Sequence, residues 1–66
     1  MAAGTRGKLK ENCEGIHRNI DWIKFHCEKS LMLLPDGYLQ LQDSFNAVIK
    51  IADQLDEFNQ GIYSHL

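Results

Sequence analysis

The sequence predicts an all-α protein, an antiparallel helical hairpin (αα-hairpin) with heptad seams that self-associates into a four-helix bundle or coiled-coil assembly. Two observations carry this prediction. Apolar residues recur at alternating spacings of three and four in both halves of the 66-residue chain, which is the pattern of a and d positions in helices that pack on helices. One short turn with the only proline separates the halves, and a short connection makes two helices antiparallel neighbours.

The expected elements follow from this pattern in order. Residues 1–7 contain two glycines and two alanines without periodicity, so we expect a disordered lead-in there. The first helix is predicted over 8–34, the turn over 35–37 and the second helix over 38–66. Pro35 disfavours helical geometry in the residue before it, Asp36 can cap the next helix, and Gly37 tolerates the angles of a turn. Because Leu66 still fits the heptad pattern, we expect this single hairpin domain to be a fragment of a longer chain.

The a and d positions define a predicted hairpin seam between the two helices. Its apolar members are Leu9, Cys13, Ile16, Ile20, Ile23, Cys27 and Leu34 in the first helix and Leu41, Phe45, Val48, Ala52, Leu55 and Ile62 in the second. Ser30 and Asn59 are the polar residues in the pattern. A buried Asn can specify register, whereas an Asn near the end of a helix is merely solvated. We favour the solvated interpretation for Asn59 because Gly61 follows it.

A second set of apolar residues lies away from the a and d positions at 100° per residue. This candidate face for a partner or for self-association consists of Trp22, Phe25, Met32, Leu33, Ile51 and Phe58. Two interpretations stay open: the face holds copies of this chain together, which we favour, or it docks a different protein. Trp22 is the strongest single candidate in either case, because Trp dominates many interfaces.

Composition argues against several classes of function. The net charge is −2 and no basic face is present, so we expect no nucleic-acid binding. The N-terminus lacks the apolar run of a signal peptide, and the longest apolar stretch, 31–34, is too short to cross a bilayer. We therefore expect a soluble, intracellular protein, cytoplasmic or nuclear, without membrane association.

Catalytic chemistry is not indicated. The sequence has no phosphate-binding loop, no nucleophile motif and no pair of carboxylates in contrasting settings, so we expect neither enzymatic activity nor a cofactor. Cys13, His17, His26 and Cys27 are metal-ligating types, but the two pairs lie about 15 Å or more apart along one helix. One chain therefore cannot close a metal site with them, and the cysteines are predicted to be reduced apolar residues. Only an intermolecular zinc-clasped dimer could use these four side chains.

The function predicted from these observations is a non-enzymatic protein-protein interaction module. A chain of 66 residues in two helices buries too little surface to be comfortably stable alone, so a second chain is expected. The expected partner is a second copy in a homodimer, another helical protein, or both, in an oligomerisation or scaffolding hairpin of a larger protein. The alternative is a subunit of a hetero-oligomeric helical complex of the tethering or cytoskeletal kind.

Overall fold

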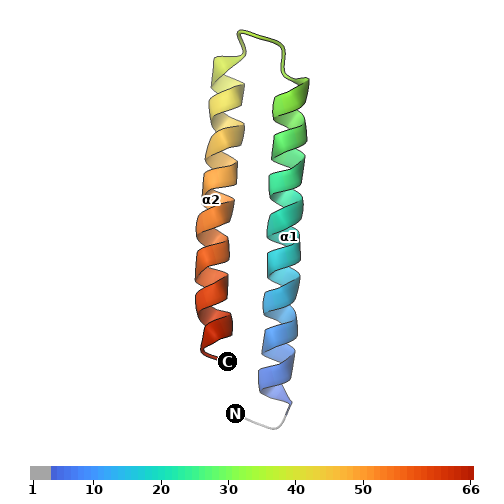
Figure 1. Ribbon diagram of the computed structural model, residues 1–66, viewed down its shortest axis with the longest axis vertical. Helices are drawn as coiled ribbons and strands as arrows, with labels where there is room; N and C mark the ends of the chain where they lie inside the picture. The colour runs from blue at the N-terminus through green and yellow to red at the C-terminus, as the bar shows by residue number, and fades with distance from the viewer. Residues whose placement is uncertain (1–3) are drawn as a thin grey trace.

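The structure is a computed structural model that describes residues 4–66. It contains two helices, α1 (Thr5–Leu33) and α2 (Leu39–Ser64), which pack against each other over their length. They run antiparallel, so that the start of α1 and the end of α2 lie at the same end of the molecule (Figure 1). The hairpin measures 55 × 15 × 11 Å. The predicted all-α helical hairpin is thus confirmed, and residues 4–66 contain no strand.

The helix α1 begins three residues earlier than the pattern predicts. Gly4 adopts a left-handed conformation with φ of 83°, and its carbonyl accepts a hydrogen bond of 3.1 Å from the Lys8 amide. Residues 5–7, which were expected to be disordered, are therefore helical. Apolar periodicity could not reveal this first turn, because its hydrogen bonds come from the backbone alone. Residues 1–3 of the expected lead-in lie outside the described residues.

The connection between the helices follows its local sequence. Leu34 is extended, with φ of −70° and ψ of 127°, as expected for a residue before proline. Gly37 has φ of 97°, a conformation that favours glycine. The helix α2 starts at Leu39 after Tyr38, and no side chain caps it. The expected capping by Asp36 is therefore wrong, because the helix starts three residues after it and the Tyr38 carbonyl instead accepts the Gln42 amide at 3.0 Å.

The core of the hairpin is one residue wide. The buried residues lie seven apart along each helix, and all of them occupy a positions; we call them the a row. The a row consists of Cys13, Ile20 and Cys27 in α1 and Ala52 and Asn59 in α2. Two antiparallel helices alone can cover only the row that faces the partner directly, so every other row keeps contact with solvent.

Asn59 is buried in this core with 6% of its surface exposed. Its amide nitrogen donates a hydrogen bond of 2.8 Å to the Cys13 carbonyl, whereas its side-chain oxygen is buried without a partner. The favoured solvated interpretation is therefore wrong. The helices stay packed beyond this level, since Lys10 still reaches Tyr63, and the end of α2 does not expose the Asn59 side chain.

Candidate functional site

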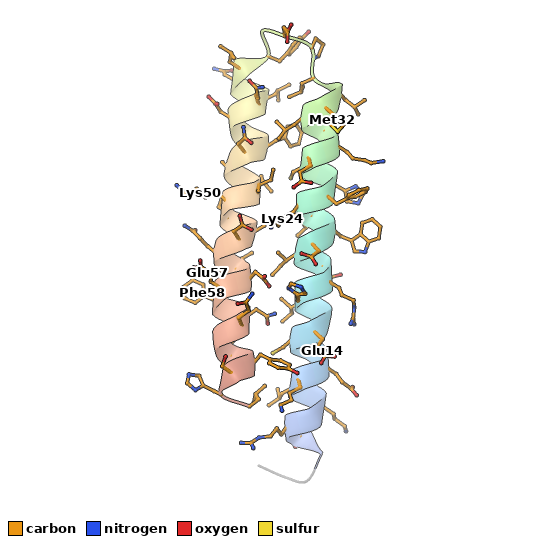
Figure 2. All side chains as sticks on the ribbon, in the orientation of Figure 1. Glu14, Lys24, Met32, Lys50, Glu57 and Phe58 are labelled. Atoms are coloured by element: carbon orange, nitrogen blue, oxygen red, sulfur yellow. The ribbon has the colours of Figure 1, made fainter. Side chains whose placement is uncertain are left out.

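One long edge of the hairpin is bridged by polar contacts from Lys10 to Lys24 and carries the partly buried Leu31 and Ile49 nearer the turn, and we call it the polar edge. It is formed by e and b positions, which lie on one side of the a row in each helix. His17 contacts Asp56 at 2.8 Å, and the Lys24 ammonium lies 2.6 Å from Asp53. Figure 2 shows Lys24 between the two helices. These pairs join α1 to α2 directly, so this edge is bridged by the chain's own side chains, which stay 17% to 56% exposed.

His17 is the centre of the polar edge. Its Nδ1 donates to the Asp56 carboxylate, and its Nε2 lies 3.3 Å from Asp21 one turn further along α1. The hydrogen bond from His17 to Asp56, followed by the charges of Asp21 and Asp56, raises the pKa of His17 above its ordinary value of 6.5. The same hydrogen bond lowers the pKa of Asp56. Gln60 also donates to Asp56, at 3.2 Å.

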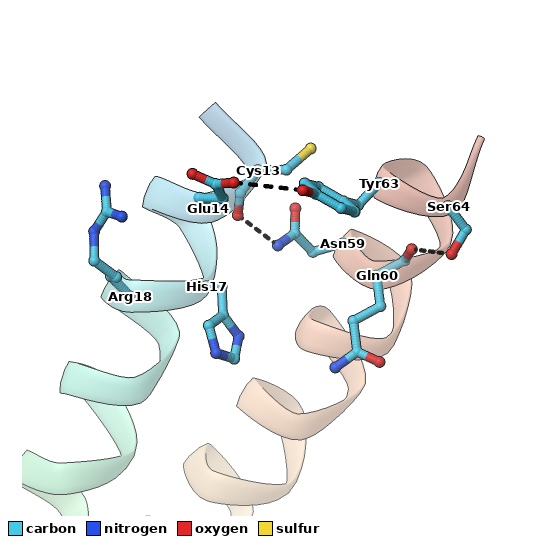
Figure 3. Close-up of a pocket in the computed structure, with 8 residues that line it drawn as sticks. All are labelled: Cys13, Glu14, His17, Arg18, Asn59, Gln60, Tyr63 and Ser64. Carbon is cyan, nitrogen blue, oxygen red and sulfur yellow. Dashed lines mark hydrogen bonds between the residues drawn. The ribbon is translucent and has the colours of Figure 1, made fainter. Parts of the chain in front are cut away.

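A shallow groove of about 570 Å³ opens beside this cluster. Figure 3 shows His17 and Glu14 from α1 facing Asn59 and Tyr63 from α2. The Tyr63 hydroxyl donates to Glu14 at 3.4 Å. Four of the groove's side chains, those of Glu14, His17, Asn59 and Tyr63, therefore already make contacts across the hairpin, while the Asn59 Oδ1 has no partner.

The opposite long edge is apolar, and we call it the open edge. Its residues occupy d positions and are 39% to 55% exposed. The open edge consists of Leu9, Ile16, Ile23, Leu41, Val48, Leu55 and Ile62. No Asp, Glu, Lys or Arg occupies a d position or a neighbouring g position of the two described helices. The structure therefore leaves a continuous, uncharged aliphatic surface half covered.

The predicted seam is divided by this arrangement. Its a positions from Cys13 to Cys27, together with Ala52, form the buried row, while Leu34 and Phe45 are partly buried. Its d positions make up the open edge. The helices face each other through a and e positions rather than through a and d positions. The contacts between the helices show this, since His17 meets Asp56 and Lys10 meets Tyr63, all four at e positions.

The residues of the predicted partner face are all exposed, but they lie on two different surfaces. Leu33, Ile51 and Phe58 occupy g positions beside the open edge. Trp22, Phe25 and Met32 occupy c and f positions, which point away from α2. The heptad pattern grouped these residues because it could not place α1 and α2 relative to each other.

The side chains of metal-ligating type are also dispersed. Cys13 and Cys27 lie in the core, His17 binds Asp56, and His26 stacks on Trp22 with ring centroids 5.6 Å apart. Over residues 4–66, no group of three or more His, Cys, Asp and Glu side chains is arranged to hold a metal ion. Neither described helix has a stretch that is long and apolar enough to span a membrane.

Comparisons with protein-family models, curated proteins and solved structures gave no match to this chain. The surfaces of the hairpin itself therefore carry the available information on function. Sequence reasoning missed the polar edge. The sequence does place basic residues at e positions of the first helix and acidic residues in the second. Their pairing can be predicted only when the register between the two helices is known.

Proposed function

We propose that this chain is a non-enzymatic oligomerisation module in which two hairpins associate through their open edges to form a four-helix bundle. The observation that carries the proposal is the half-exposed, uncharged aliphatic row on one edge, opposite an edge that is already closed by polar pairs. A second hairpin can cover this row without burying any charged side chain, which would be costly.

The exposed area supports a partner of this kind. The hairpin exposes 5354 Å² of surface, whereas a compact monomer of its mass exposes about 4,300 Å². The open edge leaves on the order of 600 Å² of apolar surface exposed, approaching the ~800 Å² that each partner buries in a standard stable complex. Leu33, Ile51 and Phe58 beside the edge add further apolar area.

Symmetry favours a second copy as the occupant. Each open edge carries a row from α1 and a row from α2, so two hairpins related by a two-fold axis can place the same rows against each other. The resulting core would have two layers of helices, as four-helix bundles have. The same surface would take the helices of a different protein if the chain is a subunit of a hetero-oligomeric helical complex.

Mass measurement in solution tests this proposal. Light scattering coupled to size exclusion at micromolar concentration should give twice the chain mass of 7.6 kDa. The double variant Ile23→Lys and Leu55→Lys places two charges in the open edge and should give the single-chain mass. The control, Asn46→Lys and Ser64→Lys, adds the same charges at exposed polar positions and should keep the wild-type mass.

Two results would contradict the open-edge dimer. A wild-type chain with the single-chain mass would show that the open edge does not bind a second copy, and the hetero-oligomeric alternative would then take its place. A double variant that keeps twice the chain mass would show that copies meet through another surface. Circular dichroism of both variants separates loss of association from loss of helix.

A further inference from the structure

The outer face of α1, which points away from α2, carries a preformed aromatic cluster with cations beside it. Trp22 is 59% exposed and contacts Phe25 edge to face, with ring centroids 5.5 Å apart. The Lys29 ammonium lies 5.0 Å from the Phe25 ring centre. Arg18 borders the same cluster one turn before Trp22, in a shallow depression that Arg18, Asp21, Trp22 and Phe25 line together. The c and f positions of α1 from Arg18 to Met32 therefore combine apolar side chains with two cations, beside the carboxylate of Asp21, and they are separate from the open edge.

The outer face of α2 has the opposite character. Its f positions are Asp43, Lys50, Glu57 and Ser64, and Phe58 beside them is 76% exposed. Figure 2 shows Lys50, Glu57 and Phe58 on the side of α2 that faces away from α1. Acidic groups thus lie near both ends of this face, with a cation between them.

The contacts between the helices establish which residues lie at the same height along the hairpin. Cys13 is level with Asn59, and His17 is level with Asp56. Further along, Lys24 contacts Asp53. By this register Arg18 lies within one turn of the height of Glu57. Lys29 and Asp43 each lie four residues from the helix end at the turn, so they have about the same height. Between these pairs, Trp22 lies level with Ile51 and Phe25 lies level with Lys50.

We propose that hairpins also associate side by side, with the outer face of α1 of one copy against the outer face of α2 of the next. Simple displacement of a copy sideways keeps the heights unchanged, so it brings Arg18 to Glu57 and Lys29 to Asp43. It also brings the Phe25 ring to the Lys50 ammonium, and a cation placed over an aromatic ring is attracted to it. This charge pattern fits a second copy of the chain. It goes beyond the open-edge dimer because its ionic and aromatic contacts come from c and f positions, and only Ile51 and Phe58 border both surfaces.

Gly15 adds a matching shape to this contact. It lies on the outer face of α1 at the height of Phe58, and a side chain built at Gly15 would meet only the end of Arg18. In the proposed contact, the Phe58 ring, the most exposed aromatic ring of α2, therefore faces the gap at Gly15 of the neighbouring copy. A contact between two different faces is heterologous and has no built-in end, so repeated addition would give an open-ended row of hairpins.

A charge-reversal exchange tests the side-by-side contact. In sedimentation velocity at low salt, the wild-type mass should keep rising past twice the chain mass between about 10 μM and about 1 mM. Arg18→Glu alone and Glu57→Lys alone should each weaken this growth by roughly tenfold in concentration. An equal mixture of the two variants should restore it, because the new carboxylate at position 18 meets the new ammonium at position 57. Arg6→Glu, at the start of α1, is the control and should grow as the wild type does.

Trp22 fluorescence gives a second readout, since its emission should shift to shorter wavelength as the row grows. A mass that stays at twice the chain mass up to about 1 mM with unchanged emission would overturn the proposal. A mixture that does not regain growth would overturn it as well. The two proposals fail separately: Ile23→Lys with Leu55→Lys should remove the open-edge dimer and leave side-by-side growth, whereas Trp22→Ala with Phe25→Ala should stop growth at the dimer.

Discussion

The two long edges of the hairpin have the same backbone and opposite chemistry. On the polar edge, e positions of both helices carry groups that pair across the interface, such as His17 with Asp56. On the open edge, d positions carry only aliphatic side chains and Ser30, with about half of the aliphatic surface exposed. One edge is complete within a single chain, and the other is incomplete. The difference indicates which side of the hairpin a second copy would cover in the proposed dimer.

The energetics of the two edges differ in the same direction. The ion pairs of the polar edge are exposed to solvent, and such pairs contribute little to stability. The aliphatic residues of the open edge would gain about 25 cal/mol for each Å² that a second hairpin removes from water. The polar edge therefore mainly determines which side of the hairpin stays exposed to solvent. The open edge carries the apolar surface whose burial would contribute more to the stability of an assembly.

The largest expected effect comes from breaking the row that lies between the two edges. Ile20→Asp places a charge without a partner in the buried a row, where Ile20 is only 4% exposed, and should cost more than about 3 kcal/mol. Helicity by circular dichroism and oligomer mass should be lost together. Gln54→Asp introduces the same group at an exposed position of α2 away from both edges and should keep both. Retained helicity in Ile20→Asp would mean that the a row is not the core.

The sequence predicted the elements well because heptad spacing and a proline turn are local signals. The residues of the a row were all within the pattern, and Cys13 and Cys27 were expected to be apolar core residues, as they are. The division of the seam was not predictable from spacing alone. Which flank of the a row meets the partner helix depends on how both helices rotate about their axes, and this rotation is fixed by contacts such as Lys24 with Asp53.

The second prediction concerns a variant in which both edges carry aliphatic side chains. His17→Leu with Lys24→Leu replaces the polar edge by aliphatic side chains, so the hairpin should bind additional copies on both sides. Light scattering should show a mass above that of the wild-type oligomer at equal concentration. Gln40→Leu with Gln54→Leu, at exposed c positions of α2 away from both edges, adds the same side chains and should change the mass less. A variant with wild-type mass would show that the polar edge does not limit assembly.

The third prediction concerns the polar residue in the core. Asn59→Leu removes a buried oxygen that has no partner, and the Cys13 carbonyl that loses the Asn59 hydrogen bond can still accept its bond within α1. The variant should be more stable by about 1 kcal/mol in urea unfolding. Asn46→Leu, on the exposed surface of α2, should leave stability nearly unchanged. Destabilisation by Asn59→Leu would show that the hydrogen bond to Cys13 outweighs the unpaired oxygen.

The smallest expected effect is a pH dependence of the polar edge. Because the folded protein raises the pKa of His17 above 6.5, protonated His17 adds stability that is complete below about pH 6.5 and is lost as the pH rises through the raised value. Asp56 acts in the opposite sense: its pKa is lowered from 3.8, so its contribution is lost as the pH falls through that lowered value. Between these limits both groups are charged, and the melting temperature at about pH 5.5 should therefore exceed that at about pH 8. His17→Gln should reduce this difference while His26→Gln, which changes a histidine outside the polar edge, should retain it. Proton resonances of the His17 ring should report the raised pKa directly, and an ordinary His17 pKa would mean that the polar edge is not closed in solution.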